Sequence, residues 1–188
     1  MDKTINCCFT GYRPHKFGFE FSENNQEYVK LENKLIDAVF SLADEGCYKF
    51  YCGMAMGFDL LAAESVIMLK KLYKKARIEL VAVIPFEKQS DSWDEHWKNR
   101  YQKVLRQADS VVYISREYKR GCYHTRNCYM VDNSDFVITW FDGQAGGTAQ
   151  TLNYAARAGK RIINLSESGV HEYIMDSPYD IIVDDFDY

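Results

Sequence analysis

Two kinds of hydrophobic pattern alternate along the 188-residue chain. Short runs such as IELVAVI and DFVITWF are almost continuously apolar, as expected for strands buried on both faces of a sheet. Longer segments with helical spacing lie between them. The predicted strands are Asn6–Thr10, Lys49–Cys52, Ile78–Ile84, Ser110–Ile114, Phe136–Trp140 and Arg161–Leu165. The predicted helices are Gln26–Glu45, Asp59–Leu72, Trp93–Gln107, Arg126–Ser134 and Thr148–Ala158.

The first predicted helix has the clearest period, because its apolar residues recur every three to four positions and form one face. These residues are Tyr28, Leu31, Leu35, Val39 and Leu42. Regular alternation of strand and helix predicts a single α/β domain with a Rossmann-like, doubly wound, mainly parallel sheet and helices on both faces. We expect this domain to span residues 1–165. Residues 166–188 are predicted to form a C-terminal appendage packed on it, with Asp180–Val183 as a candidate edge strand.

Charge and composition narrow the classes of function. The net charge is −4 and the isoelectric point is near 5.6, which argues against nucleic acid as a partner. The first residues, MDKTINCCF, lack the apolar run of a signal peptide, and no segment has the length of a membrane span. We therefore expect a cytoplasmic protein with reduced cysteines.

Cys122, His124 and Cys128 carry side chains of the types that bind zinc. Their spacing matches no common zinc module, and the sequence offers no evident fourth ligand. The alternative is a loop that contains buried cysteines. We predict no metal site.

In an open parallel sheet, ligands bind beyond the carboxyl ends of the strands, so the loops that follow the strands are the candidate site. After the first strand comes TGYRPHKF, in which Gly11 permits a turn and Arg13, His15 and Lys16 offer donors to an anion. A solvated basic turn is the alternative.

The stretch YCGMAMGFDLLAAE follows the second strand and begins the second helix. Gly53 and Gly57 are predicted to let a ligand approach the backbone. A tight turn that packs on the sheet is the alternative. Asp59 either caps the helix or meets a ribose hydroxyl, and Glu64 lies at the floor of the site or simply packs. After the third strand, Phe86 either stacks on a base or covers the core.

The most cationic stretch is REYKRGCYHTRN, which precedes the fourth predicted helix. Arg126 would stand at the start of this helix, where a cation opposes the helix dipole, so we expect it to contact a phosphate or carboxylate. After the fifth strand, Gly146 and Gly147 precede Thr148, a predicted N-cap. This turn forms a second candidate anion site.

These motifs together carry a resemblance. TGYRPHK, CGMAMGFDLLAAE, HTRNCYM and GGTAQTLNYA resemble the YpsA-like family of the SLOG superfamily. This Rossmann-like group also includes the LOG phosphoribohydrolases and the single-strand DNA-binding DprA proteins. The resemblance covers Asn6–Leu165 and implies a pocket for a nucleotide or a nucleotide-derived metabolite such as an ADP-ribose-like compound. The ligand-binding residues that it implies are Gly11, Arg13, Gly53, Gly57, Asp59, Arg126, Gly146, Gly147 and Thr148.

The sequence departs from the LOG pattern at the positions that matter for catalysis. Arg126 is similar to the LOG arginine that contacts the nucleotide and takes part in catalysis, but Asn127 replaces the lysine that follows it. The two LOG glutamates correspond to Gln150 and Thr151, and neither can act as a carboxylate base.

Three hypotheses follow from these differences. The first is a nucleotide-ligand sensor that acts through protein partners or as a homo-oligomer. The second is an N-glycosidic hydrolase with a displaced carboxylate, for which the catalytic candidates are Glu64, Asp59 and Arg126. The third is binding of single-stranded nucleic acid.

Overall fold

The computed structural model describes residues 4–73 and 77–166, and six strands in these ranges form one parallel sheet. The order of strands across the sheet is β4-β3-β2-β1-β5-β6. The strands are β1 (Ile5–Thr10), β2 (Cys47–Cys52), β3 (Glu79–Ile84), β4 (Ser110–Tyr113), β5 (Phe136–Thr139) and β6 (Arg161–Asn164). The helices are the short 3-10 helix η1 (Pro14–Lys16) and α1 (Gln26–Asp44), α2 (Phe58–Leu72), α3 (Glu95–Leu105), α4 (Cys122–Asp132) and α5 (Gly147–Arg157).

The chain reverses its direction of travel across the sheet at β1. From β1 it moves outward through β2 and β3 to β4, then returns to the other side of β1 to form β5 and β6. Within β1, Cys8 pairs with Tyr51 of β2 and with Val137 of β5. The loops after β1 and β5 therefore diverge at a topological switch point, where open α/β sheets bind their ligands.

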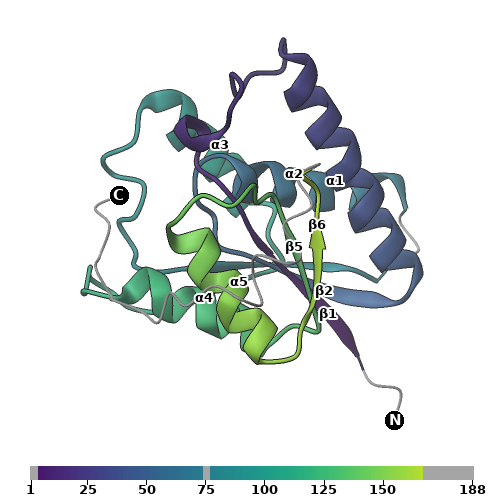
Figure 1. The fold of residues 1–188 in the computed structure, drawn as a ribbon. Helices are drawn as coiled ribbons and strands as arrows, with labels where there is room; N and C mark the ends of the chain where they lie inside the picture. Colours follow the sequence, from purple (N-terminus) through teal and green to yellow (C-terminus); the bar gives the residue numbers. More distant parts are fainter. Residues whose placement is uncertain (1–3, 74–76, 167–188) are drawn as a thin grey trace.

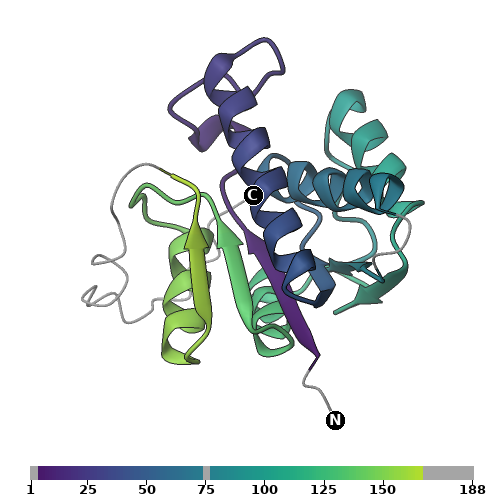
Figure 2. The same ribbon diagram turned by 90° about the vertical axis from the view of Figure 1, so that its right-hand side faces the viewer.

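Helices cover both faces of the sheet. Helix α1 packs against α2 and α2 against α3, whereas α4 packs against α5. Figure 1 shows the first three helices above the sheet and the last two below it, and Figure 2, turned by 90°, shows the arrows of β6, β5 and β1 next to one another. The predicted single α/β domain with a Rossmann-like, doubly wound sheet is confirmed.

The apolar face predicted for the first helix is also confirmed. All five of its positions are buried against the sheet and α2: Tyr28, Leu31, Leu35, Val39 and Leu42. The helix begins where the Asn25 side chain accepts hydrogen bonds from the backbone N–H groups of Glu27 and Tyr28. Local capping and tertiary burial thus agree, and the sequence pattern predicts this helix well.

The predicted start of the first helix is confirmed, and the other four starts differ from the structure: by four residues at α4, by two at α3 (Glu95 in place of Trp93) and by one at α2 and α5. Helix α4 begins at Cys122, four residues before Arg126, because Gly121 adopts a left-handed conformation with φ of 81° and starts the helix there. The N-cap of α2 is Gly57 and not Asp59, and that of α5 is Gly146 and not Thr148.

Two further expectations concern the rest of the chain and the membrane. The C-terminal appendage and its candidate strand Asp180–Val183 lie outside the described residues, apart from Ser166. Within residues 4–73 and 77–166, none of the helices combines the length and apolar character needed to cross a bilayer.

Candidate functional site

A cavity of about 350 Å³ opens at the carboxyl end of β1, beside the switch point. Four segments line it: the end of β1 with the turn that follows, the β2–α2 loop with the start of α2, the middle of α4 and the start of α5. The lining residues are Phe9, Thr10, Gly11, Tyr12, Arg13, His15, Lys16, Ala55, Met56, Asp59, Arg126, Asn127, Gly147 and Thr148. The structure thus brings together six of the nine predicted ligand-binding residues, and Gly53, Gly57 and Gly146 are not part of the lining.

The turn after β1 supplies the basic side of the cavity. Gly11 lies against the ring of Phe58, and a Cβ at position 11 would collide with that ring. The chain then continues through Arg13 into η1, which carries His15 and Lys16 along the cavity. Close packing under Gly11 therefore positions the cationic side chains that follow it.

The glycines of the β2–α2 loop have packing roles. Gly57 has φ of 89°, and a Cβ there would lie 2.6 Å from the carbonyl oxygen of Tyr12. That carbonyl accepts a hydrogen bond from the N–H of Phe58 at 3.1 Å, which joins this loop to the turn after β1. A Cβ at Gly53 would collide with the Arg126 guanidinium and lie 2.7 Å from Oδ2 of Asp59. Both glycines make room for protein atoms, which favours the packing alternative for them.

Arg126 and Asp59 form a buried pair on one wall of the cavity. Arg126 is only 5% exposed; its Nη1 donates to the carbonyl oxygen of Gly53 and lies 3.8 Å from Oδ2 of Asp59. Asp59 also accepts a hydrogen bond from the N–H of Ala55 at 3.3 Å. Burial raises the pKa of the Asp59 carboxyl, and the positive charge of Arg126 opposes this shift only in part.

Arg126 is not at the start of α4, so the helix dipole does not favour an anion there. Since α4 begins at Cys122, Arg126 lies in the second turn of the helix, away from the positive end of the dipole. The hydrogen bonding of the guanidinium gives a different reason to expect an anion. The buried Nε of Arg126 has no hydrogen-bond partner among the described residues, although Arg126 lines the cavity. A buried N–H without a partner costs free energy, so an anionic acceptor in the cavity would stabilise it.

The start of α5 forms another part of the cavity wall. Gly146, with φ of 141°, precedes the helix, and Gly147 and Thr148 are its first two residues. The backbone N–H groups of a first helical turn lack partners within the helix and point toward the positive end of its dipole. Lys16 lies next to this turn, where its Nζ donates to the carbonyl oxygen of Ala145 at 3.5 Å. A helix start, a lysine and a buried arginine therefore share one cavity.

Thr151, which the resemblance aligns with a LOG glutamate, takes part in a chain of hydrogen bonds. Asn127 Nδ2 donates to Oγ1 of Thr151 at 2.8 Å, and that hydroxyl donates to the carbonyl oxygen of Gly147 at 2.8 Å. These two hydrogen bonds link α4 to the first turn of α5. Gln150 does not line the cavity.

Glu64 lies outside the cavity. Its two carboxylate oxygens accept hydrogen bonds from Arg100, at 2.7 Å from Nε and at 2.5 Å from Nη2. The same guanidinium donates to the hydroxyl of Tyr28 on α1. Glu64 thus ties α2 to α3, which agrees with the packing alternative, and Asp59 is the one carboxylate among the described residues that line the cavity.

The other basic residues of the stretch from Arg116 to Arg126 also lie outside the lining. These exposed residues are Arg116, Lys119, Arg120 and His124. Phe86 meets the rings of Tyr118 and Tyr123 edge to face, at centroid distances of 5.5 and 5.9 Å. The described part of the chain holds no cluster of three His, Cys, Asp or Glu side chains suited to a metal ion.

Several lining residues carry no signal in the sequence. Phe9 and Thr10 belong to a buried strand, and Met56 and Tyr12 read as ordinary loop residues. The partners of Tyr12 lie about 130 residues away in the sequence, and only the folded sheet brings them together.

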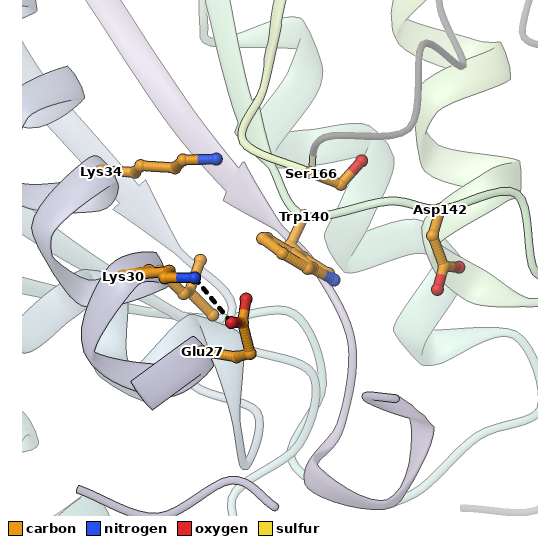
Figure 3. Close-up of a pocket in the computed structure, with 7 residues that line it drawn as sticks. Glu27, Lys30, Lys34, Trp140, Asp142 and Ser166 are labelled. Carbon is orange, nitrogen blue, oxygen red and sulfur yellow. Dashed lines mark hydrogen bonds and ion pairs between the residues drawn. The ribbon is translucent and has the colours of Figure 1, made fainter. Parts of the chain in front are cut away.

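A second cavity of about 240 Å³ lies between α1 and the end of β5 (Figure 3). Its lysines are already engaged: Lys30 pairs with Glu27 at 2.8 Å, and Nζ of Lys34 donates to the carbonyl oxygen of Leu165 at 3.3 Å. Trp140 projects between these lysines and Asp142. This cavity therefore offers fewer unsatisfied groups to a ligand than the one beside β1.

Sequence comparison places the chain in a family. Residues 7–168 match the sequence model of the YpsA family, described as the YspA SLOG family. The chain belongs to this YpsA family. Similar proteins include the uncharacterized SPbeta prophage-derived protein YoqJ of Bacillus subtilis, with 30% identity over 71% of this chain and 84% of that protein. The UPF0398 protein YpsA of Bacillus subtilis shares 26% identity over 76% of this chain and 79% of its own length.

Two solved structures have a similar fold. DNA processing protein A from Helicobacter pylori superimposes with a TM-score of 0.59 at 17% identity, over 87% of this chain and 66% of that one. DprA from Streptococcus pneumoniae gives 0.55 at 14% identity, over 86% and 50%. The YpsA-family chain thus spans between half and two thirds of these structures, and the likeness is one of fold.

Proposed function

We propose that this YpsA-family protein binds a nucleotide or a nucleotide-derived metabolite in the cavity beside β1, and that it acts as a sensor. One observation carries the proposal: Arg13, Lys16 and Arg126 line a single cavity together with the first turn of α5. Charged donors and a helix start that converge at a switch point form a favourable environment for a phosphate group.

The size and charge of the cavity support the same ligand class. Its volume of about 350 Å³ is within the range of small-molecule sites, which begins at roughly 300 Å³. Its one described carboxylate, Asp59, is next to Arg126, so the anionic ligand would meet an excess of positive charge. A phosphate would also provide the acceptor that the buried Nε of Arg126 lacks.

Binding without turnover is favoured over hydrolysis. Gln150 and Thr151 replace the carboxylates of the LOG pattern, and Glu64 is held by Arg100 outside the cavity. Hydrolysis is the second candidate function. A hydrolase would have to use Asp59, because its carboxyl group is buried in the cavity wall. Single-stranded nucleic acid ranks third, because the likeness to DprA is one of fold and the net charge is −4.

Calorimetric titration with mononucleotides, dinucleotides and ADP-ribose tests the proposal. We expect at least one phosphate-bearing compound to bind, and Lys16→Gln to weaken it roughly tenfold through the loss of a charge-assisted contact. Lys49→Gln is the matched control, since it removes the same charge near the amino end of β2, where Lys49 pairs with Glu79 at 3.7 Å.

Absence of binding at millimolar concentration in the wild type would refute the proposal, as would equal affinity losses in the two variants. The same samples can be assayed for free base. Steady release that Asp59→Asn abolishes, with binding retained, would replace the sensor by the hydrolase.

A further inference from the structure

The hydroxyl group of Tyr12 holds the loop between β5 and α5. It donates to Oδ1 of Asp142 at 2.6 Å and accepts from the backbone N–H groups of Asp142 and Gln144, at 3.3 and 3.0 Å. Tyr12 itself is only 2% exposed, whereas Asp142 and Gln144 are exposed. A rigid, buried side chain therefore fixes a loop that lies at the surface.

Two further contacts attach the same loop to the turn after β1. The Gln144 side chain donates from Nε2 to the carbonyl oxygen of Lys16 at 3.0 Å, and Nζ of Lys16 donates to the carbonyl oxygen of Ala145. The Tyr12 ring packs edge to face on Phe17 and Phe141. Tyr12 and Lys16, which both belong to the turn after β1, thus hold the loop between β5 and α5 through hydrogen bonds.

The backbone of this loop has little stiffness of its own. Gly143 and Gly146 have φ of 103° and 141°, conformations that glycine reaches without steric cost but does not hold by itself. The loop leads directly into Gly147 and Thr148, which line the cavity. The position of the first N–H groups of α5 therefore depends on what holds the loop.

We propose that Tyr12 is a positioning residue for ligand binding. Its phenol fixes the loop from Asp142 to Gly146 and so holds the start of α5 in the geometry that receives an anionic group. Ordering a loop in advance removes a cost that binding would otherwise carry. The effect of Tyr12 on ligand binding rests on the proposed function, whereas its effect on the loop does not depend on any ligand.

The test compares Tyr12→Phe with Tyr154→Phe. Tyr154 makes a similar phenol-to-carboxylate hydrogen bond, to Oδ1 of Asp132 at 2.8 Å, away from the cavity. Both variants keep the aromatic ring, so core packing is preserved. Amide hydrogen exchange in the ligand-free protein reports on residues 141–149, and calorimetry with adenosine 5′-monophosphate and with inorganic phosphate reports on affinity.

We expect Tyr12→Phe to accelerate exchange in the loop and to weaken the binding of both probes roughly tenfold. The control should leave exchange and affinity as in the wild type. A second pair separates the hydrogen bond from the charge: Asp142→Asn retains an acceptor for the phenol and should keep the wild-type affinity. Asp142→Ala removes that acceptor but leaves the two bonds that the phenol accepts from the backbone, so its effect should lie between those of the wild type and Tyr12→Phe.

Unchanged loop exchange in Tyr12→Phe would overturn the proposal, whatever the ligand. Faster exchange with unchanged affinity would also overturn it, because the loop would then be irrelevant to binding. If neither probe nor any nucleotide binds the wild type, the proposed function fails, and the exchange data alone decide whether Tyr12 fixes the loop.

Discussion

Gly53 offers the sharpest test of how the candidate site is built. Its missing side chain leaves space that the Arg126 guanidinium and the Asp59 carboxylate fill. A methyl group at position 53 would collide with the guanidinium and lie 2.7 Å from Oδ2 of Asp59. The backbone of Gly53 is outside the left-handed region, so alanine is opposed by these contacts and not by backbone strain.

The expected cost follows from what Arg126 must give up. To make room, the guanidinium has to leave the carbonyl oxygen of Gly53 and move away from Asp59. A hydrogen bond that involves a charged group contributes roughly 1.5 to 3 kcal/mol. Alanine recovers at most about 1 kcal/mol through the entropy of the unfolded chain, so Gly53→Ala is destabilising overall. For a chain of this size, a net loss of about 1 to 2 kcal/mol lowers Tm by roughly 2 to 8 °C.

Thermal and urea unfolding of Gly53→Ala measure this loss, with Gly18→Ala as the matched control. A Cβ at Gly18 meets no atom within 4 Å, and its φ is outside the left-handed region, so the control should melt close to the wild type. In an Arg126→Ala background, Gly53→Ala should cost much less, because its main obstacle is gone. If Gly53→Ala is as stable as the control, or if the two costs simply add, the packing role of Gly53 is refuted.

Two carboxylates give the remaining predictions. Glu64→Gln should lower stability by about 1 kcal/mol, since the Glu64 side chain is 36% exposed and water screens its pair with Arg100, and nucleotide affinity should not change. Lost affinity at unchanged stability would return Glu64 to the site. Burial raises the pKa of Asp59, so the folded protein binds its proton more readily than the unfolded chain. Stability relative to Asp59→Asn should therefore be constant above the raised pKa and increase as the pH falls through it toward the ordinary value of 3.8. Urea unfolding between pH 4 and pH 8 tests this, and a difference that shrinks on acidification contradicts it.

The sheet could be predicted because its physical cause is local in the sequence. Strands buried on both faces must be apolar throughout, and such runs are visible without any partner. The start of α4 could not be predicted in the same way. The stretch before Arg126 is polar and lacks a helical period, and the helix starts where Gly121 adopts φ of 81°. A glycine in the sequence can mark the start of a helix, but it can also mark a turn, so the sequence alone does not locate the start of α4.

The composition of the candidate site was predicted only in part, for a related reason. Glycine in a loop signals that a side chain would not fit, but the sequence does not say whether a ligand or a protein atom occupies the space. At Gly53 and Gly57 the space belongs to Arg126 and to the carbonyl oxygen of Tyr12. Tyr12 was missed because its role depends on contacts with Asp142 and Gln144, about 130 residues later in the sequence.

Whether the cavity can support chemistry depends on Asp59. General base catalysis needs a carboxylate that is ionised and free to reach the scissile bond. Asp59 accepts a hydrogen bond from the N–H of Ala55 and lies beside Arg126, so its Oδ2 is occupied by the protein. Its raised pKa would suit a group that donates a proton, but the neighbouring guanidinium favours the ionised form. With these opposing influences on its protonation, Asp59 is better suited to recognising a ligand in the cavity wall than to a catalytic cycle of proton uptake and release. This favours binding over turnover.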